Sequence, residues 1–179
     1  MLAMKRPPVP VVVQQHVDDV VSLRNSRTYL VAAPHVRLHQ LRRLDDRLAA
    51  HLDGLAVAGE YGAKLASMAL ESPETGEVFT AIVRAIEDRN AVGLDKLIAL
   101  SEAIPASRRG TLSAFGWVSA ASLRGITRAL LKSPNAWRRE IGLAASPKPG
   151  SGLAFCPQPF YDAPCPAPFA SSSPAPSTT

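Results

Sequence analysis

The stretch RLHQLRRLDDRLAAHLDGLAVA, residues 37–58, decides the fold class. Six leucines recur in it at intervals of three or four residues: Leu38, Leu41, Leu44, Leu48, Leu52 and Leu55. This spacing places all six on one face of an α-helix, with charged side chains such as Arg42 and Arg47 on the opposite face. The segment therefore predicts an amphipathic helix that buries its leucine face against other helices.

The flanking segments repeat this pattern at shorter lengths. Val13, Val17, Val20 and Arg24 form one helical stripe, in which the aliphatic stem of the arginine can close the apolar face. Further helices are expected at about 63–70, 75–89, 94–104, 106–117, 123–131 and 137–144, separated by proline or glycine at Pro34, Gly59, Pro73, Pro105 and Pro134. Almost no segment alternates with a period of two, so the chain is predicted to be all-α, with seven or eight short antiparallel helices.

Proline and charge divide the 179 residues into parts. Nine of the sixteen prolines follow Ser146, in a Pro/Ser/Ala-rich stretch with only two charged residues. The expected organisation is an irregular arm at 1–10, an all-α domain at 11–146 and a disordered tail at 147–179. Within the domain, residues 11–90 form N-terminal helices and residues 91–146 form two helical hairpins.

The cysteines and the hydropathy limit the class of protein. Cys156 and Cys165 both lie in the tail, so a disulfide framework is excluded and a cysteine zinc site is not expected. No apolar run approaches the ~20 residues that cross a bilayer. We expect a soluble, cytoplasmic protein that does not bind a membrane.

An internal repeat links residues 97–116 to residues 127–146 at a spacing of 30. Ala99-Leu100 corresponds to Ala129-Leu130, and the A-x-R-R motif at 106–109 returns at 136–139. Two helices in each ~30-residue unit are typical of an α-solenoid, in which each unit stacks on its neighbour. The alternative is two similar hairpins in a helical bundle.

Four motifs resemble a family of bacterial proteins of unknown function with HEAT-like repeats. They are QLRRLDDRLAAHLDGLAVAGE at 40–60, GEVF at 76–79, AFGW at 114–117 and WRREIGLAA at 137–145. The resemblance covers residues 11–146 and implies HEAT-like repeats. Some members are associated with type VI secretion loci, and the family supplies no catalytic or ligand residues. Its members continue with further repeats, so the proline-rich stretch after Ser146 suggests a truncated member, whose tail is either native or a frameshift product.

Catalytic, cofactor and metal sites are not expected. The sequence has no G-x-S-x-G motif, P-loop or G-x-G-x-x-G motif. His35 and His39 are spaced i, i+4 but lack a third ligand, and His51 and Asp53 point to different helix faces. The adjacent acid pairs Asp18-Asp19 and Asp45-Asp46 are expected on solvated faces.

The basic segment between Arg108 and Arg139 is the one candidate partner-binding feature, because it carries seven cations and no acid. These candidate residues are Arg108, Arg109, Arg124, Arg128, Lys132, Arg138 and Arg139. Arg124, Arg128 and Lys132 would follow one helix at i, i+4 and i+8. The structural alternative is that the arginines bond the carbonyls of helix ends and stack on tryptophan. Trp117 and Trp137 are expected to be packing residues.

Three functions follow, in decreasing order of support. The first is a non-catalytic helical-repeat scaffold for protein–protein interaction. The second is binding of nucleic acid, or of an acidic partner, through the arginine strip. The third is an enzyme, for which only fold analogy speaks.

Overall fold

The computed structural model describes residues 7–146, and these form eight α-helices and no β-strand. The all-α prediction is therefore confirmed for this part of the chain. The helices are α1 (Pro10–Leu30), α2 (Leu38–Val57), α3 (Glu60–Met68), α4 (Thr75–Glu87), α5 (Ala91–Ala103), α6 (Arg108–Trp117), α7 (Ile126–Leu131) and α8 (Ala136–Ala144). Single 3₁₀ turns at Ala69–Glu71 and Pro105–Ser107 follow α3 and precede α6.

The predicted boundaries are close to the observed ones, with one clear error. Pro10 takes the first helical position of α1, where its missing N–H costs nothing. The helix expected from Leu123 begins only at Ile126, because Gly125 adopts a φ of 87° and interrupts the chain there. Residues 1–6 of the arm and the whole predicted tail, with Cys156 and Cys165, lie outside the described residues.

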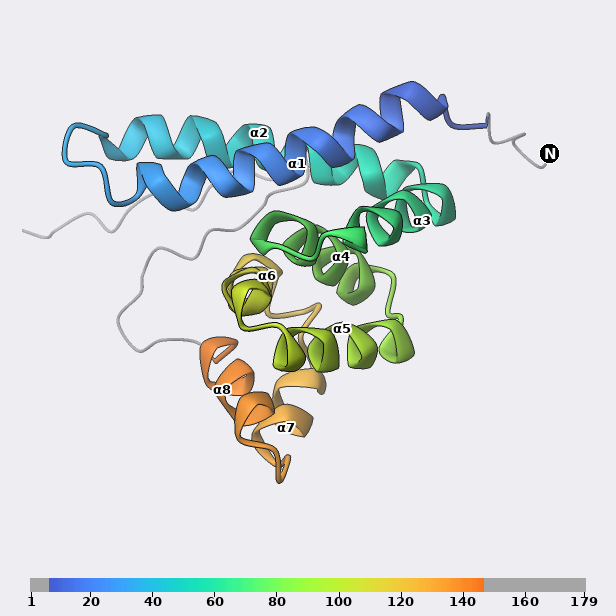
Figure 1. Cartoon of the computed structure of the whole chain (residues 1–179), viewed down its shortest axis with the longest axis vertical. Coiled ribbons are helices and arrows are strands. Elements are labelled where there is room, and N and C mark those ends of the chain that lie inside the picture. Colours follow the sequence, from blue (N-terminus) through green and yellow to red (C-terminus); the bar gives the residue numbers. More distant parts are fainter. Residues whose placement is uncertain (1–6, 147–179) are drawn as a thin grey trace, which may run out of the picture.

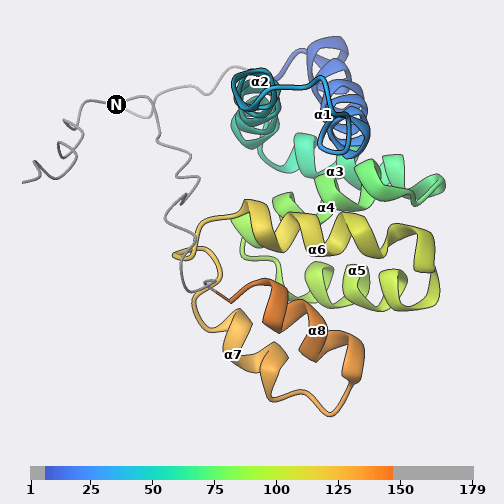
Figure 2. The same ribbon diagram turned by 90° about the vertical axis from the view of Figure 1, so that its left-hand side faces the viewer.

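The helices form successive antiparallel pairs along the long axis of the molecule (Figures 1 and 2). The α1–α2 pair lies at one end, followed by α3 and α4, then α5 and α6, and finally α7 and α8. One row connects the pairs, because α4 packs on α1, α6 packs on α4, and α8 packs on α6. In contrast, α7 packs mainly against α8.

The centre of this row is α4, which is covered on nearly all sides. Phe79, Ile82 and Val83 are fully buried, and even Thr80 is buried, with its hydroxyl donating to the Gly76 carbonyl. The valine stripe of α1 packs against this helix, and Arg24 closes the stripe as expected, with its guanidinium 5.6 Å from the centre of the Phe79 ring. The core therefore lies between α1 and α6, around α4.

Two glycines set the close spacing of the row. A Cβ added at Gly76 would lie 2.8 Å from the carbonyl oxygen of Val21, and one added at Gly110 would lie 2.3 Å from that of Thr75. Both distances are below van der Waals contact, so any larger side chain must push the helices apart. Absence of a side chain at these two positions brings α4 onto α1 and α6 onto α4.

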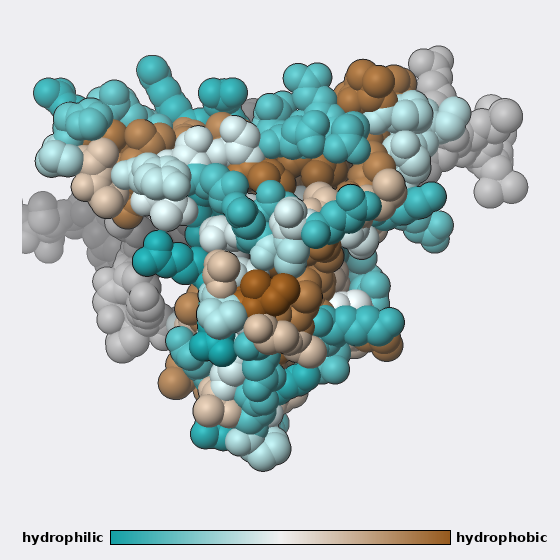
Figure 3. Space-filling view, viewed as in Figure 1, coloured by the Kyte–Doolittle hydropathy of each residue, from teal (hydrophilic) through white to brown (hydrophobic). Residues whose placement is uncertain are grey.

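The leucine face of α2 is buried over only part of its length. Leu48, Leu52 and Leu55 lie in the core, but Leu38 is 74% exposed. The first turns of α2 extend beyond α4, so only α1 covers them (Figure 1). Hydrophilic side chains cover the outer face of the α1–α2 pair, and hydrophobic surface gathers beneath it (Figure 3). The expectation of one continuous buried face is therefore wrong for the first turn.

Asp45 corrects a second expectation, because it lies in the α1–α2 interface rather than on a solvated face. Its carboxylate accepts two hydrogen bonds from the Arg27 guanidinium, at 2.7 Å from Nε and 3.1 Å from Nη2. Two charges that leave water together need such paired geometry. Asp46, its neighbour in sequence, is exposed as predicted.

Candidate binding groove

A groove of about 470 Å³ lies between the α4–α5 corner and α7. Its floor consists of aliphatic side chains, chiefly Ile86, Leu94, Ile98 and Leu130, and it is open to solvent. The groove exists because α7 has only six residues and packs mainly on α8. This short helix leaves the far side of α5 uncovered. This volume lies within the range of ~300–1,000 Å³ that is usual for ligand sites.

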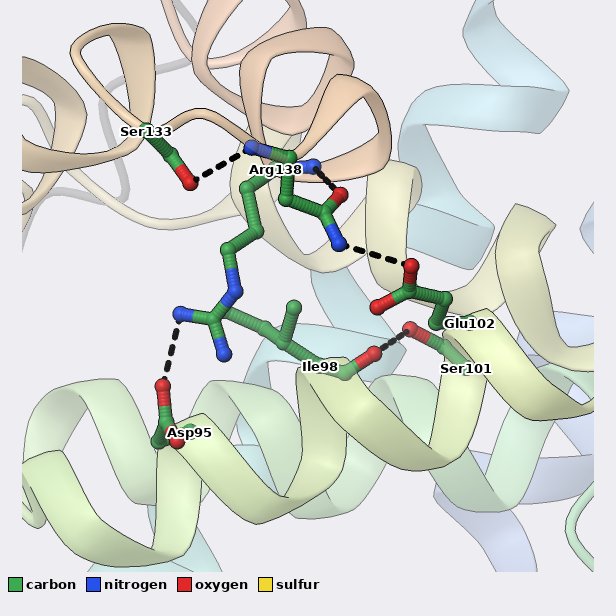
Figure 4. Close-up of polar contacts among 7 residues, drawn as sticks. Asp95, Ile98, Ser101, Glu102, Ser133 and Arg138 are labelled. Carbon is green, nitrogen blue, oxygen red and sulfur yellow. Dashed lines mark hydrogen bonds and ion pairs between the residues drawn. The ribbon is translucent and has the colours of Figure 1, made fainter.

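Arginine dominates the rim of the groove. Arg89, Arg124 and Arg138 line it, against a single carboxylate, Asp95. Arg138 and Asp95 form an ion pair of 2.6 Å with each other (Figure 4). Arg89 and Arg124 are exposed and have no acidic partner among residues 7–146. The rim therefore presents two uncompensated positive charges above an apolar floor.

Arg89 occupies an unusual backbone conformation at the end of α4. Its φ is 54°, the left-handed region that glycine normally occupies after a helix. The N–H of Arg89 bonds to the carbonyl of Ile86, and the N–H of Asn90 bonds to that of Ala85, which is the Schellman pattern of helix termination. A large side chain here costs about 1 kcal/mol relative to glycine. The strain places a guanidinium at the mouth of the groove.

Other polar side chains at the rim are engaged within the protein. Asn90 caps α5, accepting from the N–H of Gly93 at 2.8 Å. Ser133 accepts from the N–H of Asn135 at 3.2 Å. Binding a ligand through these groups would require breaking an existing bond, whereas Arg89 and Arg124 can bind without such loss.

A polar seam beside the groove fixes α8 to α5 (Figure 4). Asn135 donates to the Glu102 carboxylate at 2.7 Å and accepts from the N–H of Arg138. Deeper in, the Trp137 indole donates to the Ser101 hydroxyl at 3.1 Å, and Ser101 donates to the Ile98 carbonyl. Trp137 is buried, so its role is packing, as the sequence predicted.

Three of the seven predicted partner-binding cations, all of them arginines, act inside the fold. Arg108 donates to the carbonyls of Ser101 and Glu102 at the end of α5, and lies 5.0 Å from the Trp137 ring. Arg139 donates to the carbonyl of Ser133 at 3.0 Å and to that of Pro134 at 2.6 Å. Arg138 pairs with Asp95 as described above. These are the contacts of the structural alternative.

The remaining four cations do not form one strip. Arg124 lies before α7 rather than on it, so it does not share a helix face with Arg128 and Lys132. Arg109 is near Arg24 of α1 instead, close enough for its charge to act on that residue. Burial lowers the pKa of Arg24 in α1, and the charges of Arg27 and Arg109 lower it further. Only Arg124 of these four lines the groove, together with Arg89, which the sequence reading missed.

A histidine pair between α1 and α2 was also missed. The Nδ1 atoms of His16 and His51 lie 3.0 Å apart, and Asp19 Oδ2 lies 3.6 Å from His51 Nδ1. The two histidines are 35 residues apart, so no local sequence motif predicts their contact. Residues 7–146 hold no group of three or more His, Cys, Asp or Glu side chains that could bind a metal ion. His35 and His39 are exposed, and His35 precedes α2.

A second hollow of about 820 Å³ lies at the N-terminal end of α1, beside Val12, Val57 and Tyr61. It has no lysine or arginine in its lining and a single carboxylate, Glu60. It lacks the opposed apolar and cationic parts of the groove beside α7. We therefore take the latter as the candidate site.

Comparison with known proteins adds no further assignment: no protein-family model, curated protein or solved structure matches the chain. Among the described helices, none is both long and apolar enough to cross a membrane.

Proposed function

We propose that this chain is a non-catalytic helical-repeat scaffold that binds a segment of another protein. The observation that carries the proposal is the groove beside α7, with its aliphatic floor and its rim of Arg89 and Arg124. A partner segment can bury apolar side chains on the floor, which supplies affinity, while polar groups at the rim fix its orientation.

The proposal includes a HEAT-like α-solenoid, in line with the family resemblance of residues 11–146. The pairs α3–α4, α5–α6 and α7–α8 follow one another, and their second helices form one row. The 30-residue spacing of the A-x-R-R motifs places Arg108 and Arg138 at the openings of α6 and α8. Helical repeats of this kind offer extended surfaces to protein partners. Partners from type VI secretion loci are the first to test, given the resemblance.

Nucleic acid is the alternative partner, and the composition of the groove speaks against it. Single-stranded nucleic acids stack their bases on aromatic side chains, and no aromatic residue lines this groove. Three arginines of the predicted strip already bind within the protein. The four others, Arg109, Arg124, Arg128 and Lys132, are exposed and retain the capacity to contact phosphates.

A library of random displayed peptides tests the scaffold proposal directly. We expect the full chain to enrich peptides, and the enriched sequences to lose binding to Ala129→Glu, which puts a carboxylate on an exposed position of the groove lining. Ala99→Glu is the matched control, because Ala99 is equally helical and exposed but lies outside the groove. Absence of enrichment, or equal binding to both variants, would refute the proposal.

A duplex DNA titration at about 50 mM salt tests the alternative, because phosphate contacts are strongest at low ionic strength. The scaffold proposal predicts only weak, non-specific DNA binding, which charge reversal at Arg109, Arg128 and Lys132 weakens further. Tight DNA binding that disappears in this triple variant would replace protein by nucleic acid as the partner.

A further inference from the structure

We infer that the segment bound in this groove is acidic and amphipathic: aliphatic side chains fill the floor and carboxylates pair with Arg89 and Arg124. This inference rests on the proposed function and adds the chemistry of the partner. It follows from the contrast between the two parts of the groove, one apolar and one cationic.

The floor determines the apolar half of the partner. Ile86, Leu94, Ile98 and Leu130 are at most 6% exposed, and they present only aliphatic carbon to the groove. Ala91 and Ala129 widen it, since their side chains end at Cβ. Aliphatic side chains of a partner gain free energy by leaving water on such a surface.

The rim determines the charged half. Among residues 7–146, Arg138 already has Asp95, whereas Arg89 and Arg124 have no carboxylate within ion-pair distance. Guanidinium groups bind carboxylates with two parallel hydrogen bonds, and they do so best where an apolar surface excludes water. A basic partner segment would meet repulsion from both arginines, so the rim also excludes it.

The backbone at Arg89 gives the rim its position. A helix that ends in the Schellman pattern normally has glycine at this residue, which would carry no charge. Arginine has a conformational cost there, and within residues 7–146 it forms no ion pair with an acidic side chain. Because Arg89 keeps a strained backbone without an acidic partner in the described chain, we infer that its partner lies on another molecule.

Peptides enriched from the random library provide the test. We expect them to combine Asp or Glu with Leu, Ile or Val, and a synthetic copy to bind Arg89→Gln/Arg124→Gln at least about tenfold more weakly than the unaltered chain. Affinity for the unaltered chain should fall as salt rises, and this fall should flatten in the double variant. Arg42→Gln/Arg43→Gln, on the exposed face of α2, is the matched control and should bind normally.

The possible failures are distinct. One outcome is that the enriched peptides need Ala129 unaltered but are neutral or basic, or bind the Arg89→Gln/Arg124→Gln variant equally well. That outcome would overturn the acidic partner and would not contradict the scaffold proposal. Peptides that ignore Ala129→Glu, or no enriched peptides at all, would overturn the scaffold proposal itself. Circular dichroism and urea unfolding of both double variants establish that they are folded.

Discussion

The α1–α2 pair and the α7–α8 pair stand at opposite ends of the same row of helices, yet they are built differently. The first consists of helices of 21 and 20 residues, and the last of helices of six and nine. The long pair covers α4 and still extends beyond it. The short pair cannot cover α5, and the groove is the space it leaves. Helix length at the two ends thus decides where the surface is closed and where it is open.

The polar contacts also differ between the two ends: they add to a large apolar interface at the long end and lie beside an open groove at the short end. At the long end, one half-buried ion pair, Arg27 with Asp45, joins two helices that already share an extensive apolar interface. At the short end, hydrogen bonds of Trp137 and Asn135 hold α8 to α5 beside an open groove. The short pair depends more on individual contacts because it buries less apolar surface.

The largest expected effect is at the row that joins both ends. Gly110→Ala should lower the free energy of unfolding by about 3 kcal/mol, since the new Cβ would lie 2.3 Å from the Thr75 carbonyl oxygen. Urea denaturation followed by circular dichroism measures this. Gly116→Ala, in the same helix with nothing within 4 Å, should instead raise stability by about 0.5–1 kcal/mol. Equal effects of the two changes would mean that α6 does not lie so close to α4.

The next effect concerns the long end. Asp45→Ala should cost about 2 kcal/mol, below the usual value for a fully buried pair because the Arg27 side chain is 35% exposed and can regain water. Asp46→Ala, one residue further on and exposed, should change stability by less than about 0.5 kcal/mol. If both changes have small effects, Asp45 is solvated, as its position beside Asp46 first suggested.

A smaller effect is expected at the short end. Trp137→Phe keeps an aromatic ring but removes the pyrrole part of the indole, so the cost of a smaller buried ring adds to that of the lost hydrogen bond to Ser101, about 1 kcal/mol. A double-mutant cycle with Ser101→Ala should return most of that value as coupling energy. Native-state hydrogen exchange should show earlier opening of α8 than of α1. A coupling energy near zero would show that indole and hydroxyl do not bond.

The smallest effect has the opposite sign. Arg89→Gly should raise stability by about 0.5 kcal/mol, because glycine adopts the φ of 54° without strain. Arg128→Gly, inside α7, should lower it by about 1 kcal/mol, the usual cost of glycine in a helix. If Arg89→Gly is also destabilising, the arginine side chain makes a stabilising contact within the chain and its strain has a local explanation.

The sequence predicted the helices well because the spacing of apolar residues in each one shows which of its faces is buried. The stripe of Val13, Val17, Val20 and Arg24 could be read directly, since burial on one helical face repeats every three or four residues. The start of the helix expected from Leu123 was misplaced, because glycine can stand before a helix, as Gly125 does, or be tolerated within one. The local sequence did not distinguish these outcomes.

The candidate site was only partly predictable. The charge run pointed to Arg124 and Arg138, which do line the groove, but also to Arg108 and Arg139, which bond to helix-end carbonyls. A guanidinium serves either purpose, and its neighbours decide which. Arg89 stands at the end of the predicted helix 75–89, but only the structure shows that it takes the left-handed position that glycine normally occupies.

By itself, the sequence determined that this chain forms short amphipathic helices between proline and glycine breaks, because periodicity and backbone restriction are properties of neighbouring residues. Only the tertiary structure decided which faces were covered. Asp45 became buried, His16 met His51, and the shortness of α7 left an apolar floor open beneath two arginines. Such outcomes depend on contacts between residues far apart in the chain, and no local spacing records them.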